Sequence, residues 1–244
     1  SLFCHLVYFT LNMRVSAIVC AYNEAKTIKP IIEVLLAHPR IDEVIVVDDG
    51  STDRTKKIIS SIKNQKLIMI HHKKNLGKGA AIAGAVKTAK GNILLFIDAD
   101  THSFHQSHID MLLSPVLIDP KCMVIGLRDG EKLLDKTLNA ILKSIGGERT
   151  IMKKYVTPLL SKIKDSGYGV ETILNLATVR HNRRIYYVPL PQLFHPLKTA
   201  KKTLMEVLKE YWREQNQVIA QLLDYDKYEL PSFKEILSKL RTLA

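Results

Sequence analysis

The chain has 244 residues, and its 36 Lys and Arg against 24 Asp and Glu give a formal net charge of +12. With 46% hydrophobic and 25% charged residues, it has the composition of a globular protein, and its length suffices for one large domain with an appendage. Its apolar runs are far shorter than the roughly 20 residues of a membrane-spanning helix. The charge favours an anionic partner: nucleic acid, a membrane surface and a phosphorylated small molecule all fit.

Residues 1–13 are apolar but lack the basic start and the cleavage site of a secretory signal, so we interpret them as an extension before the folded domain. The three cysteines, Cys4, Cys20 and Cys122, are widely spaced. Such spacing predicts neither a disulfide framework nor a zinc ribbon. A reducing, cytoplasmic location fits this pattern.

Strand and helix patterns alternate over the first hundred residues. The strand patterns are apolar on both faces, as in parallel strands covered by helices. This alternation predicts an α/β fold with a mostly parallel, Rossmann-like sheet flanked by helices. The predicted strands are 15–20, 43–47, 67–70 and 93–97. Three helices are predicted between and after them: one begins near Thr27, one follows Asp53 as its cap, and one spans 79–89.

The second half of the chain is less regular. Strands are predicted at 123–125 and at 184–188, the latter stopped by Pro189 and Pro191. Residues 132–165 hold eight Lys or Arg against three Asp or Glu, which predicts a basic segment. A long amphipathic helix is expected from Thr199.

Ser232 and Glu235 have the spacing of a capping box, which predicts a short final helix. Three histidines, His102, His105 and His108, recur at intervals of three, which favours a solvated helix face over a zinc site. We expect three regions: the extension 1–13, a domain 14–196 divided near residue 130, and a helical tail 197–244.

Polar residues follow each of the first four predicted strands. Ligands of open parallel sheets bind at the carboxyl ends of the strands. Asp98 and Asp100 follow the fourth strand, and paired carboxylates suit Mg²⁺ or Mn²⁺ bridging to substrate phosphates. Asp48 and Asp49 follow the second strand, where a carboxylate can accept hydrogen bonds from a base or a ribose.

The other two strand ends add an aromatic ring and a cation. Tyr22, Asn23 and Glu24 follow the first strand. Gly77 and Lys78 follow the third strand, at the start of a helix, where flexible backbone and positive charge favour phosphate.

Together these stretches resemble the nucleotide-sugar half of a GT-A glycosyltransferase, most closely the inverting family 2 group that includes dolichol-phosphate mannose synthases. The resemblance covers residues 14 to about 130. The matching stretches, in family order, are 21–24, 47–53, 75–79 and 96–100.

The resemblance implies a role for each matching residue. Asp100 would bind the divalent metal, and Lys78 would approach the base or phosphate. Asp49 would hold the base or ribose, and Asp98 the ribose or sugar. The nucleotide site would comprise Ala21, Tyr22, Asn23, Glu24, Asp49, Gly77, Lys78, Asp98 and Ala99.

Beyond residue 130 the resemblance is looser. It implies that Arg128 faces a phosphate, that residues 147–149 belong to an acceptor loop, and that Glu171 acts as general base or orients its helix. His195 would be either a second metal ligand or an ordinary surface histidine. A helix-start Glu is also favoured by the helix dipole alone, so the two interpretations of Glu171 stay open.

Other classes lack their motifs. The first strand-to-helix turn has no glycine, which argues against a dinucleotide-dependent dehydrogenase, and no phosphate-binding Gly-x-x-x-x-Gly-Lys-Ser/Thr is present. A non-enzymatic nucleic-acid-binding domain would explain the charge but not the carboxylates at the strand ends.

We therefore expect a metal-dependent enzyme that transfers a sugar from a nucleotide-diphosphate sugar, with inversion, to an anionic or lipid-phosphate acceptor. The alternative within the fold is a retaining enzyme of the glucosyl-phosphoglycerate synthase type. No nucleic-acid partner is expected. The tail around Tyr211 and Trp212 is a candidate for membrane contact or for a homodimer interface.

Overall fold

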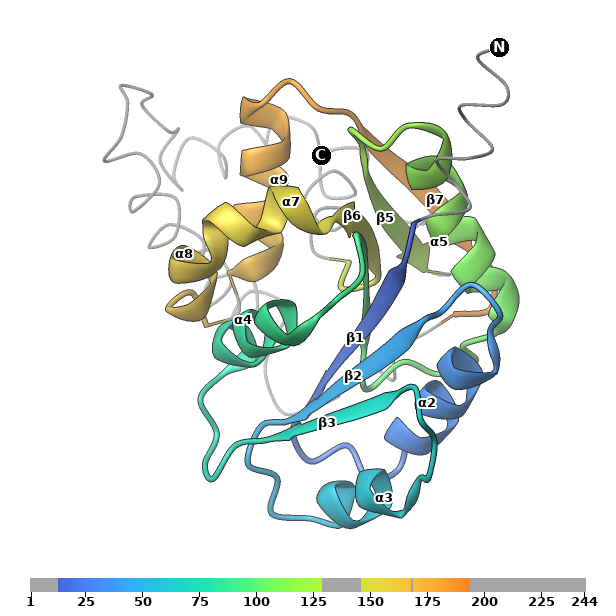
Figure 1. The fold of residues 1–244 in the computed structure, drawn as a ribbon, viewed down its shortest axis with the longest axis vertical. Coiled ribbons are helices and arrows are strands. Elements are labelled where there is room, and N and C mark those ends of the chain that lie inside the picture. The colour runs from blue at the N-terminus through green and yellow to red at the C-terminus, as the bar shows by residue number, and fades with distance from the viewer. Residues whose placement is uncertain (1–12, 129–145, 168, 194–244) are drawn as a thin grey trace, which may run out of the picture.

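The computed structural model describes residues 13–128, 146–167 and 169–193. They form a seven-stranded sheet in the order β3-β2-β1-β4-β6-β5-β7 (Figure 1). The strands are β1 (Val15–Ala21), β2 (Glu43–Asp48), β3 (Leu67–His71), β4 (Ile93–Asp98), β5 (Met123–Arg128), β6 (Arg149–Met152) and β7 (Ile185–Leu190). All neighbours pair in parallel except β6, which runs antiparallel to β4 and β5. The predicted mostly parallel α/β sheet is confirmed.

Helices cover both faces of the sheet. One apolar cluster joins one face of the sheet to α2 (Ile28–Ala37), α3 (Thr55–Ser61) and α5 (Gln106–Ile118). The other joins the opposite face to α4 (Lys78–Thr88), α8 (Leu160–Lys164) and α9 (Val170–Arg180). The short helices α7 (Lys153–Val156) and η2 (Thr157–Leu159) connect β6 to α8. Alternate residues of β1 divide between the clusters: Ala17 and Val19 face one, and Ile18 faces the other.

Asp53 lies one residue before Arg54, the N-cap position of α3, and its carboxylate accepts the amide of Thr55, the first residue of the helix, at 2.9 Å. This is the hydrogen bond expected of the predicted cap. The carboxylate also accepts the Ala25 amide at 3.2 Å, which joins two loops. One local prediction was wrong in part: Pro189 does not stop the last strand, because β7 continues to Leu190 and ends directly before Pro191. A proline is tolerated there because β7 is the outermost strand of the sheet.

The histidine prediction was wrong for His108. This side chain is 1% exposed and lies 2.9 Å from the Pro191 carbonyl through Nε2. Its Nδ1 accepts a hydrogen bond from the His105 amide at the start of α5. His108 therefore belongs to the core contact between α5 and the end of β7. The predicted tail from Thr199, its capping box at Ser232, residues Tyr211 and Trp212, and the extension 1–12 lie outside the described residues.

Among the described residues, no helix is both long and apolar enough to cross a bilayer.

Candidate active site

A cleft opens at the carboxyl ends of β1, β2 and β4, bordered by the start of α4. It encloses about 760 Å³ of empty space, including the solvent at its open mouth. Most of the residues predicted for a nucleotide site converge on it, although they come from four separate stretches of the chain. Its lining is Cys20, Ala21, Tyr22, Glu24, Asp49, Asn75, Gly77, Lys78, Ala81, Asp98, Ala99 and Asp100.

Asn23 does not line this cleft. Its side-chain oxygen accepts hydrogen bonds from the amides of Thr52, at 2.8 Å, and Asp53, at 3.3 Å. Its backbone has φ = 59°, a left-handed conformation that Asn tolerates better than most residues. Asn23 therefore ties the loop after β1 to the loop after β2 and sets the position of Tyr22, which is 44% exposed at the cleft.

Asp49 organises the loop after β3. One carboxylate oxygen accepts the Leu76 amide at 2.9 Å and lies 2.7 Å from His72 Nδ1, and the other accepts the Gly77 amide at 2.8 Å. Gly77 has φ = 90°, which only glycine adopts readily. The buried carboxylate thus shapes the loop that leads into α4, and it still forms part of the cleft wall.

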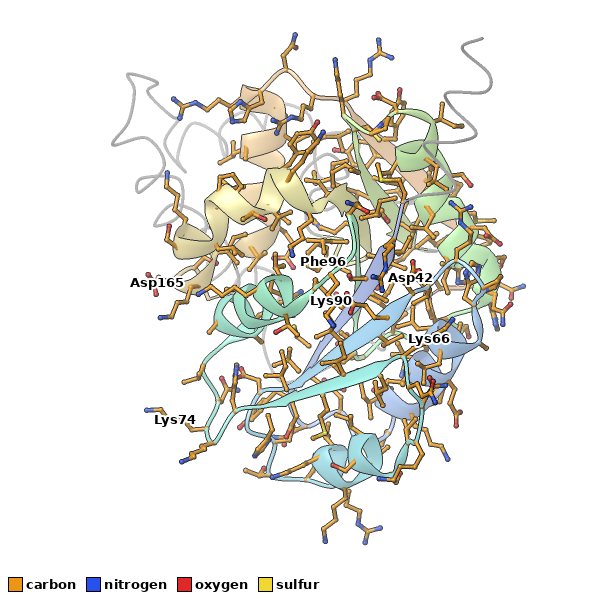
Figure 2. All side chains as sticks on the ribbon, viewed as in Figure 1. Asp42, Lys66, Lys74, Lys90, Phe96 and Asp165 are labelled. Atoms are coloured by element: carbon orange, nitrogen blue, oxygen red, sulfur yellow. The ribbon has the colours of Figure 1, made fainter. Side chains whose placement is uncertain are left out.

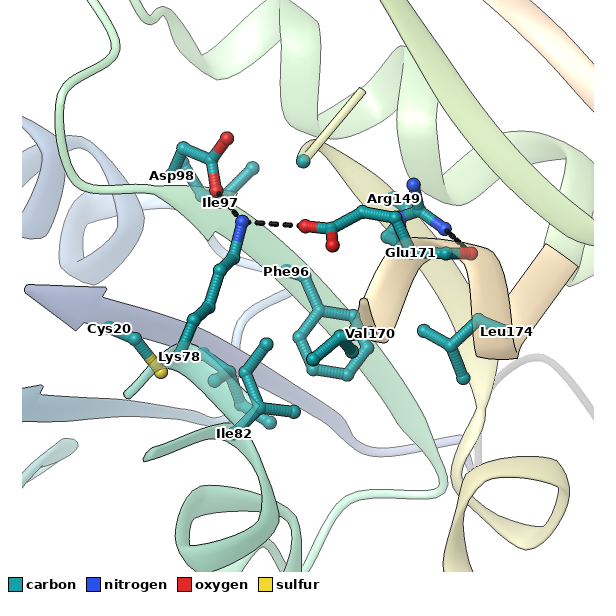
Figure 3. A pocket seen from close by; sticks show the side chains of 12 residues that line it. Cys20, Lys78, Ile82, Phe96, Ile97, Asp98, Arg149, Val170, Glu171 and Leu174 are labelled. Carbon is teal, nitrogen blue, oxygen red and sulfur yellow. Dashed lines mark hydrogen bonds and ion pairs between the residues drawn. The ribbon is translucent and has the colours of Figure 1, made fainter. Parts of the chain in front are cut away.

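Five charged side chains of alternating sign run in a line across the base of the site. Glu148 accepts hydrogen bonds from Arg128 at 2.7 and 2.8 Å, and Arg128 donates to Asp98 at 3.1 Å. Lys78 then donates to Asp98 at 2.9 Å and to Glu171 at 2.6 Å (Figure 3). These residues come from β4, β5, α4, α9 and the residue before β6, so the line holds both halves of the sheet together.

The surroundings fix the protonation of Lys78 and Cys20. Burial alone would lower the pKa of Lys78, but the carboxylates of Asp98 and Glu171 outweigh it and hold the pKa well above its ordinary value. Burial raises the pKa of the Cys20 thiol to about 12, against a smaller lowering by Lys78. Lys78 is therefore a cation and Cys20 a neutral thiol at physiological pH, which makes Cys20 a poor nucleophile.

Residues 147–149, which the resemblance placed in an acceptor loop, form an inner brace. Gly147 packs against the carboxylate of Asp98 so closely that a Cβ at this position would overlap it. Glu148 is fully buried, and its second oxygen accepts the Thr101 hydroxyl at 2.8 Å. These two residues hold the Asp98 side of the site.

Arg149 holds the Glu171 side. It is 2% exposed, and its guanidinium donates to the Gly146 carbonyl, to the Glu171 carbonyl at 3.4 Å and to Asn175 Oδ1 at 3.1 Å. These bonds connect the loop before β6 to the first turns of α9 (Figure 3). Burial of both Glu148 and Arg149 indicates an internal supporting role rather than contact with an acceptor.

The predicted metal ligand Asp100 lies on the cleft wall next to Asp98. Within the described ranges, no group of three or more His, Cys, Asp or Glu side chains is arranged to enclose a metal by itself. A carboxylate on an open cleft nevertheless fits Mg²⁺ or Mn²⁺, since Mg²⁺ is commonly bound through one or two carboxylates together with waters and substrate phosphates. His195, the other predicted ligand, lies outside the described residues.

The basic segment 132–165 is only partly described, and its described cations do not converge on the cleft. Arg149 is internal, and Lys153 donates to the Ala89 carbonyl at the end of α4. Lys153 and Lys154 line a separate hollow with Asn92, at the opposite end of β4 from Asp98. These three residues of the predicted basic segment therefore do not line the cleft.

Sequence reasoning missed the support residues. The resemblance assigned Glu148 and Arg149 to an acceptor loop and not to the interior, since charged residues are usually exposed, and His72 was given no role. The strand-end rule found the residues of the cleft because their chemistry follows directly from the predicted topology.

The fold and this cleft define a Rossmann-like sheet with a polar site that can take a nucleotide and an anionic group. The model of glycosyl transferase family 2 matches residues 16–162. The chain belongs to this family.

Two curated relatives illustrate the likeness. A dolichyl-phosphate beta-glucosyltransferase of Trichomonas vaginalis is 35% identical over 105 residues, which are 38% of this chain and 31% of the relative. An Escherichia coli enzyme named UDP-Glc:alpha-D-GlcNAc-diphosphoundecaprenol beta-1,3-glucosyltransferase is 43% identical over 91 residues, 36% of each chain. These matches span only about a third of the relatives.

Solved structures match over a longer range. Glucosyl-3-phosphoglycerate synthase of Mycobacterium tuberculosis, in complex with Mn²⁺, UDP-glucose and glycerol 3-phosphate, has a TM-score of 0.67 and 25% identity. That alignment covers 91% of this chain and 83% of the other. The same synthase in complex with Mg²⁺ and UDP has a TM-score of 0.68.

Proposed function

We propose that this chain is a metal-dependent glycosyltransferase that takes a hexose from a uridine-diphosphate sugar and transfers it to a phosphate-bearing acceptor. The observation that carries the proposal is the convergence of Tyr22, Asp49, Lys78, Asp98 and Asp100 on one cleft at the carboxyl ends of the strands. Relatives and structural neighbours that act on or bind UDP-glucose support this donor.

The cleft offers each part of such a donor a suitable surface. The exposed ring of Tyr22 provides a face for a base, and Asp49 provides carboxylate oxygens for its N–H groups or for ribose hydroxyls. Asp100 would hold Mg²⁺ or Mn²⁺ against the diphosphate, and the ion would stabilise the negative charge of the departing nucleotide. Lys78 supplies a fixed positive charge beside it.

Glu171 is the proposed general base. It comes from the first turn of α9 and reaches the far side of Lys78, where an acceptor hydroxyl would meet the sugar and lose its proton to Glu171. An ionised acceptor phosphate would attack without a base. Direct attack with Glu171 assisting the acceptor would invert the anomeric centre. The retaining alternative is favoured by the length of the match to glucosyl-3-phosphoglycerate synthase, and the anomeric configuration of the product, read by NMR, distinguishes the two.

A binding panel tests the donor. Thermal unfolding is measured with UDP-, GDP- and dTDP-sugars, each with and without Mn²⁺. We expect the largest stabilisation from UDP-glucose with Mn²⁺, because a ligand that binds the folded state raises the unfolding temperature. Equal shifts for all nucleotides, or none for any, would contradict the proposal.

The variant Asp100→Ala tests the metal. It should abolish the Mn²⁺-dependent part of the shift and the release of UDP from UDP-glucose, while the unfolding temperature without ligand stays within a few degrees of the wild type. Lys121→Ala, a change at an exposed position two residues before β5, serves as the control. Full activity of Asp100→Ala in the presence of a chelator would exclude the metal role.

A further inference from the structure

Almost the whole charge surplus of the chain comes from one stretch. Residues 54–97 contain ten Lys or Arg and no Asp or Glu, which is +10 of the total of +12. Lys78 is neutralised within the active site, and Lys66 donates to the Ile41 carbonyl at 2.8 Å. The question is what the others face.

Five of these cations lie at the same end of the sheet as the cleft. Three lie at or just before the first turn of α3, which follows β2, and two lie in the loop after β3. Because β2 and β3 pair in parallel, with Asp48 opposite His71, both segments lie at the end of the sheet that carries the cleft. We call this group the basic rim; its members are Arg54, Lys56, Lys57, Lys73 and Lys74.

The side chains of the basic rim are exposed, and none has a hydrogen bond or ion pair to another side chain in the part of the chain that the structure describes. Figure 2 shows Lys74 pointing away from the ribbon at the end of its loop. The close approach of the two loops is built into the backbone: a Cβ on Gly50, which has φ = 72°, would overlap the backbone of Lys74. Unpartnered like charges on neighbouring segments repel one another and favour an anionic partner.

An exposed apolar side chain sits beside these cations. Leu76 is 50% exposed, although its amide is fixed by Asp49. A large aliphatic group next to several lysines is the combination that binds the interface of an anionic membrane, where the apolar group inserts and the cations meet the lipid phosphates. Nucleic acid fits less well, because residues 54–77 contain no Phe, Tyr or Trp on which bases could stack.

We propose that the basic rim and Leu76 form a docking surface for a membrane containing anionic lipids. In this orientation the mouth of the cleft faces the bilayer, since the rim and the cleft share one end of the sheet. The biological purpose of this surface rests on the proposed function, because a lipid-phosphate acceptor would be presented at that interface. The docking itself requires no donor.

Flotation with vesicles tests the surface. The full chain is mixed with vesicles of phosphatidylcholine alone or with 30 mol% phosphatidylglycerol, at 0.05 and 0.5 M NaCl. Wild type should bind only the anionic vesicles and should be released by salt. Each basic residue near such a surface contributes about fivefold to the binding affinity. The affinity for anionic vesicles should therefore fall well over tenfold in the variant with Lys56, Lys57, Lys73 and Lys74 all changed to Gln.

Matched variants locate the effect. Changing Lys29, Lys121, Lys154 and Lys164 to Gln removes the same charge from other exposed positions and should alter vesicle binding less than threefold. Leu76→Ser should weaken vesicle binding severalfold, and the weakening should persist when salt is varied, because the inserted contact is apolar. Equal losses of vesicle binding in the two quadruple variants, or no loss in either, would overturn the proposal.

Two further measurements separate this proposal from others. Binding of a 20-nucleotide single strand and a duplex should be at least tenfold weaker than vesicle binding at the same salt; tighter nucleic-acid binding through the rim would overturn the proposal. Affinity for UDP with Mn²⁺ should be unchanged in the rim variant. If the rim variant changed donor binding but not vesicle binding, the proposal would be wrong and the rim would instead attract the anionic donor to the cleft. Vesicle binding without any nucleotide binding would refute the proposed function alone.

Discussion

The ammonium group of Lys78 lies 2.6 Å from Oε1 of Glu171, a residue 93 positions further along the chain. The same ammonium group lies 2.9 Å from Asp98. Lys78 thus lies between Asp98, which borders the cleft, and Glu171, the proposed general base. A donor whose phosphates attract Lys78 would weaken the ion pair between Lys78 and Glu171. Donor binding would thus be coupled to the charge environment of the proposed base.

Removing the charge of Glu171 tests its role. For Glu171→Gln we expect the release of UDP from UDP-glucose, in the presence of an acceptor that attacks through a hydroxyl, such as glycerol 3-phosphate, to fall by about 10²–10⁴-fold, since general-base catalysis contributes that much. UDP binding with Mn²⁺ should change little. Glu171→Asp, which keeps the charge but shortens the side chain, should retain more activity than the Gln variant. A Gln variant within about twofold of wild type would exclude the base role.

The position of the Asp98 carboxylate requires that residue 147 has no side chain. In Gly147→Ala the new methyl group would overlap the Asp98 carboxylate, so either Asp98 or the strand β6 must shift. We expect at least a tenfold loss in turnover and a lower unfolding temperature. Gly84→Ala is the matched control, because a Cβ on Gly84 meets no atom within 4 Å. Equal behaviour of the two variants would show that the packing against Asp98 is unimportant.

The mostly parallel α/β class of the fold and most of the cleft could be predicted from the sequence, for a physical reason. Parallel strands buried on both faces give continuous apolar runs, and their carboxyl ends must meet at one edge. The pairing of Glu148 with Arg128 could not be predicted, since it depends on β6 entering the sheet between β4 and β5. The prediction at Pro189 failed for a similar reason: a proline is permitted within β7 only because β7 lies at the edge of the sheet.

Stability should fall at alkaline pH through the two described cysteines. Burial raises the pKa of both Cys20 and Cys122 to about 12, from an ordinary value near 9. Between these values the unfolded chain loses thiol protons that the folded chain keeps, so the free energy of unfolding decreases as pH rises. Urea unfolding at pH 7, 8, 9 and 10 should show this decrease above about pH 8.5. The double variant Cys20→Ala, Cys122→Ala should show a shallower decrease, and an unchanged slope would contradict the prediction.

A buried hydroxyl offers a stabilising substitution. Thr150 lies in β6 with no exposure, and its hydroxyl has no hydrogen-bond partner among the described residues. An unsatisfied buried polar group costs about 1–3 kcal/mol, and Val has nearly the same shape as Thr. Thr150→Val should therefore raise the free energy of unfolding by about 1 kcal/mol, or the unfolding temperature by about 2–4 °C. Thr150→Ser, which keeps the hydroxyl and loses a methyl group, should destabilise.

The position of β6 also has a consequence for folding. β1, β2 and β3 pair with neighbours close in sequence, so they can form a sheet as soon as they are synthesised. β5 is made before β6 yet lies beyond it, and its partners β6 and β7 both come later in the chain, so β5 can join the sheet only after they are made. Gly147, Glu148 and Arg149 come into place only with the insertion of β6. The sheet can thus exist without a working site, and loss of β6 from a destabilised molecule would end catalysis before the rest of the protein unfolds.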